Sequence, residues 1–221
     1  MHDMTSQGTV FFDLDGTLTD PQEGIVNCIV HALEKLDVPR PDRHRLTRCI
    51  GPPLQESFVE LVGPERAELA VQLYRQRFDA CGWQENRRYP GILEGLQKLS
   101  ERGVQLCVAT SKPQIFAERI VEHFDMQPYF QHIFGPGLDG TRADKSELLA
   151  FAVAQTHPSR PIAMVGDRKH DMIGAGSNAI PAIGVTYGFG SAQELRTAGA
   201  QDIVDSVSTL FVALDDLLPE S

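Results

Sequence analysis

The sequence predicts an α/β fold in which an open parallel sheet, flanked by helices, carries one helical insertion. Short apolar runs alternate with amphipathic stretches of helical spacing over most of the chain, which is the pattern of such a sheet. One interval near the N-terminus holds only helical patterns. With 221 residues, of which 42% are hydrophobic, the chain is long enough to bury the core of one large domain or of one domain with an insertion.

The predicted strands are apolar runs that end at turn or polar residues, as buried parallel strands do. The clear ones span residues 9–12, 104–109, 162–165 and 182–185. Two weaker runs, at residues 131–134 and 202–204, are predicted as a further strand and an edge strand. The helices between the strands are predicted from their amphipathic spacing. They span residues 92–99, 114–124, 145–154 and 192–195.

The insertion follows the first strand and its polar segment. Helices are predicted at residues 23–36, 54–61 and 65–78, with no convincing strand among them. Gly51-Pro52-Pro53 interrupts this pattern, and Tyr89-Pro90-Gly91 marks the return to the sheet. We therefore predict a core domain of residues 1–20 and 89–221 and a helical domain of residues 21–88.

Charge divides unevenly between these two parts. Residues 21–88 hold ten basic and ten acidic side chains, so the net charge of −10 belongs to the remainder of the chain. This acidic balance argues against nonspecific nucleic-acid binding, which depends on Lys and Arg neutralising phosphates. It suits a protein that gathers carboxylates around a cation.

The sequence also indicates where the protein is located. No stretch reaches the roughly 20 apolar residues that cross a bilayer, and residues 1–8 lack the basic start and hydrophobic run of a targeting segment. The four cysteines form no CxxC or Cys/His cluster. We predict a soluble, cytoplasmic protein with reduced thiols and no membrane partner, and both a monomer and a homodimer remain open.

Two carboxylates follow the first predicted strand, in Asp13-Leu14-Asp15-Gly16-Thr17. Asp13 and Asp15 stand at positions i and i+2, so on an extended chain they point to the same side. They lie just past the carboxyl end of a strand, where open α/β sheets bind their ligands. Asp and Gly also form ordinary turns, so this segment alone does not establish a site.

A second acidic cluster follows residues 162–165, in Gly166-Asp167-Arg168-Lys169-His170-Asp171. If a helix begins near Arg168, Asp167 caps it and Asp171 lies one turn along on a similar face, toward the first pair. A helix cap followed by a solvated acid is the simpler interpretation of this segment by itself. Four carboxylates in one crevice would repel strongly, and a divalent cation with a Lys relieves that repulsion.

Two further segments offer groups suited to an anion. Thr110 and Ser111 place hydroxyls and backbone N–H groups after a core strand and before a helix, which suits phosphate oxygens, although such residues are also common helix caps. Lys145 opens a predicted helix, against the helix dipole. A lysine there usually faces solvent, but its position makes most sense if anions lie nearby.

Taken in order, these motifs resemble those of the haloacid dehalogenase superfamily: DxDGT from Asp13, a hydroxyl at Thr110, Lys145, and GDxxxD from Gly166. They cover the chain from Phe11 to about residue 171, and the helical insertion is similar to the superfamily's type 1 cap. The resemblance implies a Rossmann-like core with strand order 5-4-1-2-3 and an inserted α-helical cap.

The resemblance also implies a role for each motif residue. Asp13 would be the nucleophile and Asp15 the general acid and base of a phosphatase that forms an aspartyl phosphate. Thr110 and Lys145 would bind the phosphate of a small metabolite, and Ser111 is a further candidate beside them.

The implied cofactor is Mg²⁺. Its ligands would be Asp13, the backbone carbonyl of Asp15, and Asp167, with Asp171 in support.

The substrate is indicated less directly. The segment from Arg48 to Leu54 and the segment Gly184–Gly190 are similar to those of phosphoglycolate phosphatase-like members, many of which act on nucleoside monophosphates. The same residues also fit a helix-breaking turn and a loop over the sheet. Arg48 is predicted to pair with a second anionic group of the substrate, or else it is one of nine arginines covering the cap surface. The prediction is a phosphoglycolate phosphatase-like enzyme, with a nucleoside 5′-monophosphatase as the alternative.

The same residues bear on other activities of this scaffold. A dehalogenase has no leaving oxygen to protonate, so Asp15 favours phosphate chemistry. A phosphonatase needs a cap lysine, and the only one in residues 21–88 is Lys35, in the first cap helix. A phosphoglucomutase-like phosphotransferase shares all four motifs, and a non-catalytic binding protein on the same scaffold also remains open. A dinucleotide-binding enzyme is disfavoured because no GxGxxG is formed.

Overall fold

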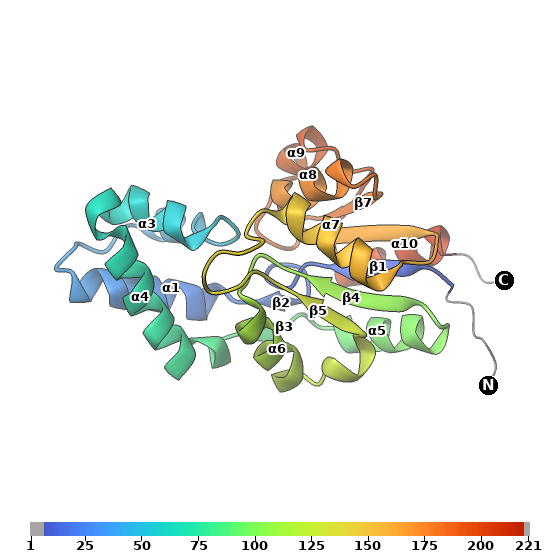
Figure 1. The fold of residues 1–221 in the computed structure, drawn as a ribbon, viewed down its shortest axis with the longest axis horizontal. Helices are drawn as coiled ribbons and strands as arrows, with labels where there is room; N and C mark the ends of the chain where they lie inside the picture. Colours follow the sequence, from blue (N-terminus) through green and yellow to red (C-terminus); the bar gives the residue numbers. More distant parts are fainter. Residues whose placement is uncertain (1–6, 219–221) are drawn as a thin grey trace. The chain divides into compact units, whose positions relative to one another are not determined.

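The computed structural model describes residues 7–218 and contains a six-stranded sheet of order β5-β4-β1-β6-β7-β8 (Figure 1). All neighbouring strands are parallel. The strands are β1 (Thr9–Phe12), β4 (Gln105–Ala109), β5 (His132–Phe134), β6 (Ile162–Gly166), β7 (Ala182–Val185) and β8 (Asp202–Val204). The predicted α/β class is confirmed. The predicted order 5-4-1-2-3, which numbers only the core strands along the chain, is confirmed as β7-β6-β1-β4-β5, and β8 extends the sheet beyond β7.

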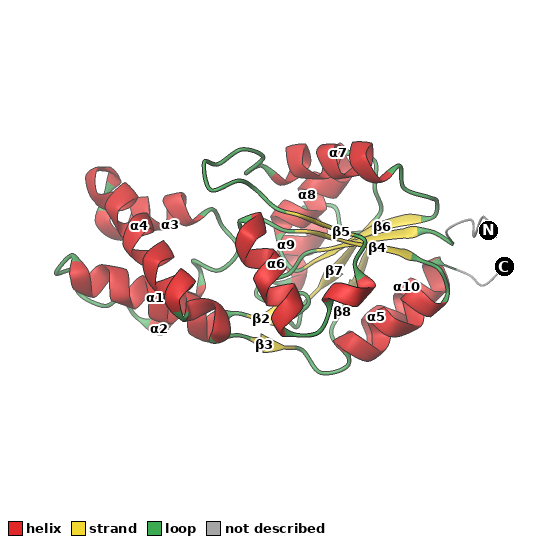
Figure 2. Ribbon diagram, turned by 60° about the horizontal axis from the view of Figure 1, so that its bottom comes forward, coloured by secondary structure: helices red, strands yellow, loops and turns green. Residues whose placement is uncertain are grey.

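Helices follow the strands and cover both faces of this sheet (Figure 2). They are α5 (Ile92–Glu101), α6 (Gln114–His123), α7 (Lys145–Thr156), α8 (Lys169–Ser177), α9 (Ala192–Thr197) and α10 (Val207–Leu217), with a 3₁₀ turn at Gln127–Tyr129. The ends of the helices predicted with both bounds agree within two residues. Of α8 only a start near Arg168 was predicted, and α10 was not predicted.

The central strands are apolar on both sides because both faces are covered. All four residues of β1 are buried, and alternate residues point to opposite faces. Phe11 and Met164 pack with side chains of α7, α8 and α9, such as Leu149 and Leu195, in one continuous cluster. This packing fixes the ends of β1 and β6 side by side.

The described chain divides into two compact units. One takes the chain up to Leu18 and again from Arg88, and the other spans Thr19–Arg87. A two-stranded sheet of β2 (Thr19–Asp20) and β3 (Arg87–Arg88) joins the two points where the chain leaves and returns. We refer to these units below as the core and the insert.

The insert is helical. Its elements are α1 (Gln22–Lys35), α2 (Arg43–Thr47), α3 (Leu54–Val62), α4 (Pro64–Ala80) and a 3₁₀ turn at Gly82–Gln84. Phe58, Tyr74 and Phe78 form an aromatic cluster, with ring centroids 6.2 Å and 5.7 Å apart for successive pairs. The one helix here that was not predicted is α2, whose five residues are too few to show a helical period.

Within residues 7–218, none of the helices combines the length and the apolar character needed to cross a membrane.

Candidate active site

The candidate site lies at the carboxyl ends of three adjacent strands of the core. Asp13 follows β1, Thr110 follows β4 and Asp167 follows β6. Phe12 is in register with both Val108 and Val165, so these three strands end at the same level of the sheet. The backbone N–H of Asp13 donates to the carbonyl of Val165 at 2.8 Å, which ties the first site residue to the neighbouring strand.

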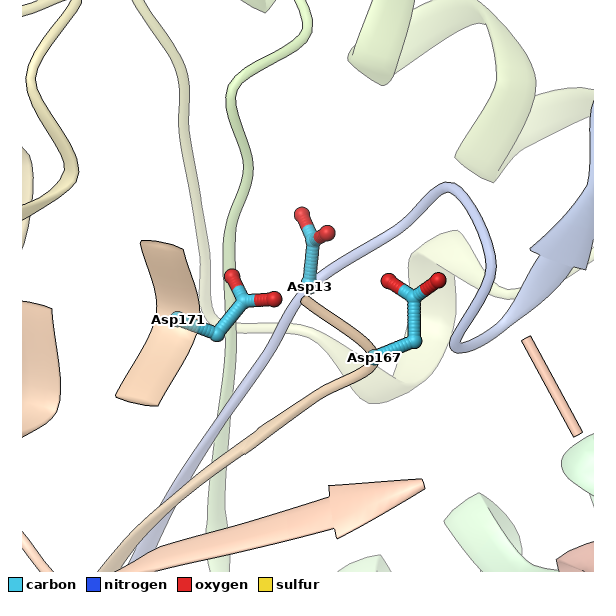
Figure 3. A group of neighbouring side chains, drawn as sticks. All are labelled: Asp13, Asp167 and Asp171. Carbon is cyan, nitrogen blue, oxygen red and sulfur yellow. The ribbon is translucent and has the colours of Figure 1, made fainter. Parts of the chain in front are cut away.

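Three buried carboxylates meet at this edge (Figure 3). Asp13, Asp167 and Asp171 each offer an oxygen, and these oxygens all lie within 4.8 Å of one another. Asp171 reaches the group from the first turn of α8, where its Oδ2 accepts a hydrogen bond from the backbone N–H of Arg168 at 3.1 Å. The structure therefore brings together three of the four predicted acidic side chains.

One detail of this prediction was wrong. Asp167 does not cap α8, because the N-cap residue is Arg168, which has the extended φ of −125° and ψ of 159°. Asp171 supplies the side-chain half of that cap from inside the helix. Asp167 is thus left outside the helix, and its carboxylate is available to the site.

The carboxylate of Asp167 lies in surroundings that disfavour its negative charge. Its Oδ2 accepts a hydrogen bond from the Phe189 backbone at 2.7 Å, whereas its Oδ1 is buried with no hydrogen-bond partner among the described residues. Burial raises the pKa of Asp167 well above its usual value, and the charges of Asp171 and Asp13 raise it further. Three carboxylate oxygens converging in a buried place are a donor set that fits a divalent cation.

Glycines let the backbone approach these carboxylates. A Cβ at Gly16, where φ is +82°, would lie 2.2 Å from Oδ2 of Asp167. A Cβ at Gly188 would lie 2.5 Å from Cβ of Asp167, and one at Gly166 would lie 2.3 Å from Cγ of Asp171. These segments are therefore shaped around the carboxylates, and larger residues would displace them.

Lys145 supplies a positive charge to the same cluster. Its Nζ donates to Oδ1 of Asp13 at 3.2 Å and to the carbonyl of Ala109 at 2.8 Å, and it lies 2.7 Å from Oδ1 of Asp171. Burial disfavours the charged lysine, but the two carboxylates outweigh this effect and raise the pKa of Lys145. Asp144 caps α7 by accepting from two backbone N–H groups, which fixes the turn that begins with Lys145.

Asp15 is not one of the three clustered carboxylates, and its ion pair is with a different lysine. Its Oδ2 pairs with Nζ of Lys112 at 2.7 Å. Burial raises the pKa of Asp15, an effect that Lys112 opposes and that the charge of Asp13 reinforces. A carboxyl group with a raised pKa is suited to giving up and accepting a proton.

Backbone hydrogen bonds hold the segment that carries the hydroxyls of Thr110 and Ser111. Thr110 is buried, its N–H donates to the carbonyl of Phe134 at 3.0 Å, and its Oγ1 accepts from the N–H of Lys112 at 3.2 Å. Ser111 is half-buried beside it. The roles of Thr110 and Ser111 in phosphate binding stay predictions.

Arg48 belongs to the other unit. It is the C-cap residue of α2 in the insert and is exposed. Its predicted contact with substrate stays a prediction.

Two features of the site were not predicted from the sequence. Lys112 is buried and ion-paired, although a lysine two positions beyond a strand is ordinarily solvated. The backbone of Phe189, which binds Asp167, carries no side-chain signal at all. A Thr-Ser-Lys-Pro segment directly after a buried strand was the available hint for Lys112.

The fold and the site together define an aspartate-centred α/β enzyme. The model of the haloacid dehalogenase-like hydrolase family matches residues 10–185, which include every carboxylate described above. The chain belongs to this family, and it is a hydrolase by that membership.

Known proteins similar to the chain carry related names. It is 46% identical over 190 residues to a 5′-nucleotidase of Pseudomonas aeruginosa, covering 85% of this chain and 86% of the relative. It is 40% identical over 204 residues to the tyrosine-protein kinase PtkA of Mycobacterium tuberculosis, covering 92% of this chain and 67% of the relative. The crystal structure of a predicted phosphatase from Clostridium acetobutylicum superposes with a TM-score of 0.90 at 43% identity, covering 96% of this chain and all of that one.

The predicted likeness to phosphoglycolate phosphatases is weaker. A phosphoglycolate phosphatase of Agrobacterium fabrum is 30% identical over 188 residues, covering 80% of each chain. The names of these relatives all refer to phosphate chemistry, and the substrates that they mention differ.

Proposed function

We propose that this protein is a Mg²⁺-dependent phosphatase that hydrolyses the phosphate ester of a small metabolite through an aspartyl phosphate on Asp13. The observation that carries the proposal is the division of labour among the buried charges. Asp13 is held by Lys145 beside Asp167 and Asp171, whereas Asp15 pairs separately with Lys112. A nucleophile and a proton donor need such different surroundings.

The cation site is proposed at the three clustered carboxylates. Asp13, Asp167 and the backbone carbonyl of Asp15 would hold Mg²⁺, with Asp171 in support. The unpartnered Oδ1 of Asp167 supports this assignment, since a buried oxygen without a donor is costly unless a cation binds it. When bound, Mg²⁺ neutralises these carboxylates and polarises the phosphate.

The first chemical step is attack by Asp13. Its carboxylate oxygen forms a bond to phosphorus while the bond from phosphorus to the ester oxygen breaks. Asp15 gives its proton to the departing oxygen, so an alcohol leaves and Asp15 becomes a carboxylate. Lys145, together with the predicted phosphate ligands Thr110 and Ser111, stabilises the charge on the transferred phosphoryl oxygens.

The second step returns the enzyme to its starting state. Asp15, now a carboxylate, takes a proton from a water molecule whose oxygen attacks phosphorus. The bond from phosphorus to Asp13 breaks, inorganic phosphate forms, and Asp13 regains its carboxylate. Both Asp15 protonation states are therefore used in each turnover.

The substrate is proposed to be a small phosphorylated metabolite of the phosphoglycolate type. A nucleoside 5′-monophosphate is the second candidate, favoured by the higher identity to the relative named 5′-nucleotidase, 46% against 30% for the phosphoglycolate phosphatase. No nucleic-acid or membrane partner is proposed. The four cysteines are free thiols, which supports the predicted cytoplasmic location.

The test is a phosphate-release screen of the purified protein against several dozen phosphomonoesters, including phosphoglycolate and nucleoside 5′-monophosphates. Wild type should release phosphate from a subset, and Asp13→Asn should lose at least about 10³-fold in kcat/KM because no nucleophile remains. Asp216→Asn, at an exposed position of α10, is the matched control and should retain full activity. Undiminished activity in folded Asp13→Asn would refute the assignment. Transfer of phosphate from ATP to tyrosine, with no ester hydrolysis, would favour the activity named for PtkA.

A further inference from the structure

A buried lysine of the core has no part in the mechanism described above. Lys112 is 9% exposed, and its side chain is 6% exposed. Its Nζ lies 2.7 Å from Oδ2 of Asp15, whose side chain is 15% exposed. Burying an ammonium group is unfavourable unless a partner compensates. Because a buried ion pair adds little to stability, we looked to function for the role of this pair.

The backbone around Lys112 is held tightly enough to aim the side chain. The Lys112 N–H donates to Oγ1 of Thr110 at 3.2 Å, and the next helix is anchored by the Gln114 N–H, which donates to the carbonyl of Pro136 at 3.0 Å. A Cβ at Gly135 would lie 2.6 Å from the carbonyl oxygen of Lys112, so the two segments approach each other closely. The direction of the lysine is thus set by the loop after β4 and by its contact with the segment after β5.

The ion pair uses only one of the two oxygens of Asp15. Oδ2 is paired with Lys112, whereas Oδ1 is buried and has no hydrogen-bond partner among residues 7–218. A carboxyl group held through one oxygen presents the other in a defined direction. Proton transfer requires the donor oxygen to lie within hydrogen-bond reach of the departing oxygen.

The second buried lysine makes the assignment specific. Lys145 contacts Asp13 and Asp171, the carboxylates proposed for phosphoryl transfer and cation binding. Lys112 forms an ion pair with Asp15, the carboxylate proposed for proton transfer. The two lysines therefore act on different carboxylates, and removing each should produce a different kinetic signature.

We propose that Lys112 is the positioning residue of the general acid: it holds Oδ2 of Asp15 so that Oδ1 is directed to the leaving-group oxygen. This inference rests on the proposed function, because it assigns a role within that reaction. In the step concerned, the proton on Asp15 moves to the ester oxygen as the bond from that oxygen to phosphorus breaks. Lys112 neither donates that proton nor contacts the phosphoryl group.

The test uses the dependence of rate on the leaving group. Aryl phosphates from p-nitrophenyl to unsubstituted phenyl phosphate differ in how much the departing oxygen needs a proton. Their kcat/KM values report the steps up to release of that oxygen, so poor leaving groups expose a misplaced acid. For Lys112→Met we expect a loss of about 30-fold or more on phenyl phosphate and about 3-fold or less on p-nitrophenyl phosphate, within the range attributed to general acid catalysis.

Four comparison variants complete the experiment. Asp15→Asn should show the same steepened dependence, and adding Lys112→Met to it should cost little more, because both changes remove one function. Lys112→Arg should recover part of the loss on phenyl phosphate, since it restores a cation to Oδ2. Lys98→Met, at an exposed position of α5, should match wild type throughout. If Lys112→Met does not fold, Lys112→Gln serves as the neutral variant under the same expectation.

The outcomes separate this inference from the function on which it rests. An equal loss on every ester, or no loss on any, in a folded neutral variant would overturn the role of Lys112 while phosphatase activity stands. Absence of hydrolysis by wild type over the whole series and the metabolite screen would overturn the proposed function, and the role of Lys112 with it. A loss confined to the poor leaving groups, shared with Asp15→Asn, supports the proposal.

Discussion

The core and the insert differ in the burial of their charged side chains. The buried charged residues of the described chain all belong to the core: Asp13, Lys112, Lys145, Asp167 and Asp171. In the insert, the buried polar residues are the uncharged Thr19 and Ser57. Its arginines and acids are exposed or half-buried. Arg77 and Glu85, for example, form an ion pair in which the two side chains are 21% and 28% exposed.

This difference has a physical meaning. Burying charge opposes folding, so five buried charges at one sheet edge indicate a place where stability is exchanged for reactivity. The insert is built as an ordinary helical unit around an aromatic cluster, and its surface can change with little loss of stability. We infer that chemistry belongs to the core. That the insert selects among substrates stays a prediction, which rests on Arg48.

Removing divalent metal is expected to have the largest effect on this comparison, because it acts on the core alone. Exhaustive EDTA treatment should abolish phosphate release, and added Mg²⁺ should restore it. Mg²⁺ should also raise the unfolding temperature, since a ligand at 100 times its Kd stabilises the folded state by about 2.7 kcal/mol. Both effects follow from the mutual repulsion of Asp13, Asp167 and Asp171, which a cation relieves.

The control for this prediction compares a variant of one clustered carboxylate with a variant of an exposed one. In Asp167→Asn, the shift of unfolding temperature with Mg²⁺ should shrink, whereas Asp216→Asn should keep it. Full activity after complete chelation would contradict the metal site and reopen the dehalogenase interpretation.

Lys145→Ala is expected to have the next largest effect. It removes the cation that contacts Asp13 and Asp171, and with it a stabilising charge near the transferred phosphoryl group. We expect kcat/KM to fall by about 10²- to 10³-fold on every phosphomonoester, with the ranking of substrates unchanged. Steady-state kinetics on three or more active esters measures this.

The leaving-group dependence distinguishes Lys145 from Lys112. Lys145→Ala should lower the rates of phenyl and p-nitrophenyl phosphate by similar factors, unlike Lys112→Met. A change in substrate ranking on loss of Lys145 would show that core residues also select the substrate. The proposed division of roles between the core and the insert would then be wrong.

The sequence predicted the parts of this enzyme that leave a local pattern. Buried strands alternate with helices, and polar groups at strand ends mark the ligand edge of such a sheet, so the placement of Asp13 and Asp167 followed from the fold. The α8 cap was misassigned because either Asp167 or Arg168 could adopt the extended conformation before a helix. Val207–Leu217 was missed because its β-branched start and apolar middle do not favour a helix over a strand.

Long-range contacts were beyond such patterns. Lys112 pairs with a residue 97 positions away in the chain, and its burial depends on how the loops after β4 and β1 meet. The position of Lys145 at a helix start favoured nearby anions, but only the resemblance to a known motif assigned it to phosphate binding. A charge becomes a functional residue here through its environment, which tertiary structure creates.

The smallest expected effect is that of Arg48→Ala in the insert, and it is the most direct test of the division between the units. Arg48 is exposed at the C-cap of α2, next to the Gly51-Pro52-Pro53 turn, so its loss should leave folding intact. If it pairs with a second anionic group of the substrate, KM should rise about 2- to 5-fold for esters that carry such a group, the range of an exposed ion pair.

Two comparisons isolate that contact from general electrostatics. On p-nitrophenyl phosphate, which lacks a second anionic group, Arg48→Ala should change kcat/KM by less than about 2-fold. Lys35→Ala removes one positive charge from α1 of the insert at an exposed position and should leave the ranking of esters unchanged. Because Lys35→Ala and Arg48→Ala alter the net charge equally, a ranking that changes only with Arg48 must come from a specific contact and not from the overall field. Equal effects of Arg48→Ala on all esters, or none on any, would place substrate selection elsewhere than in this loop.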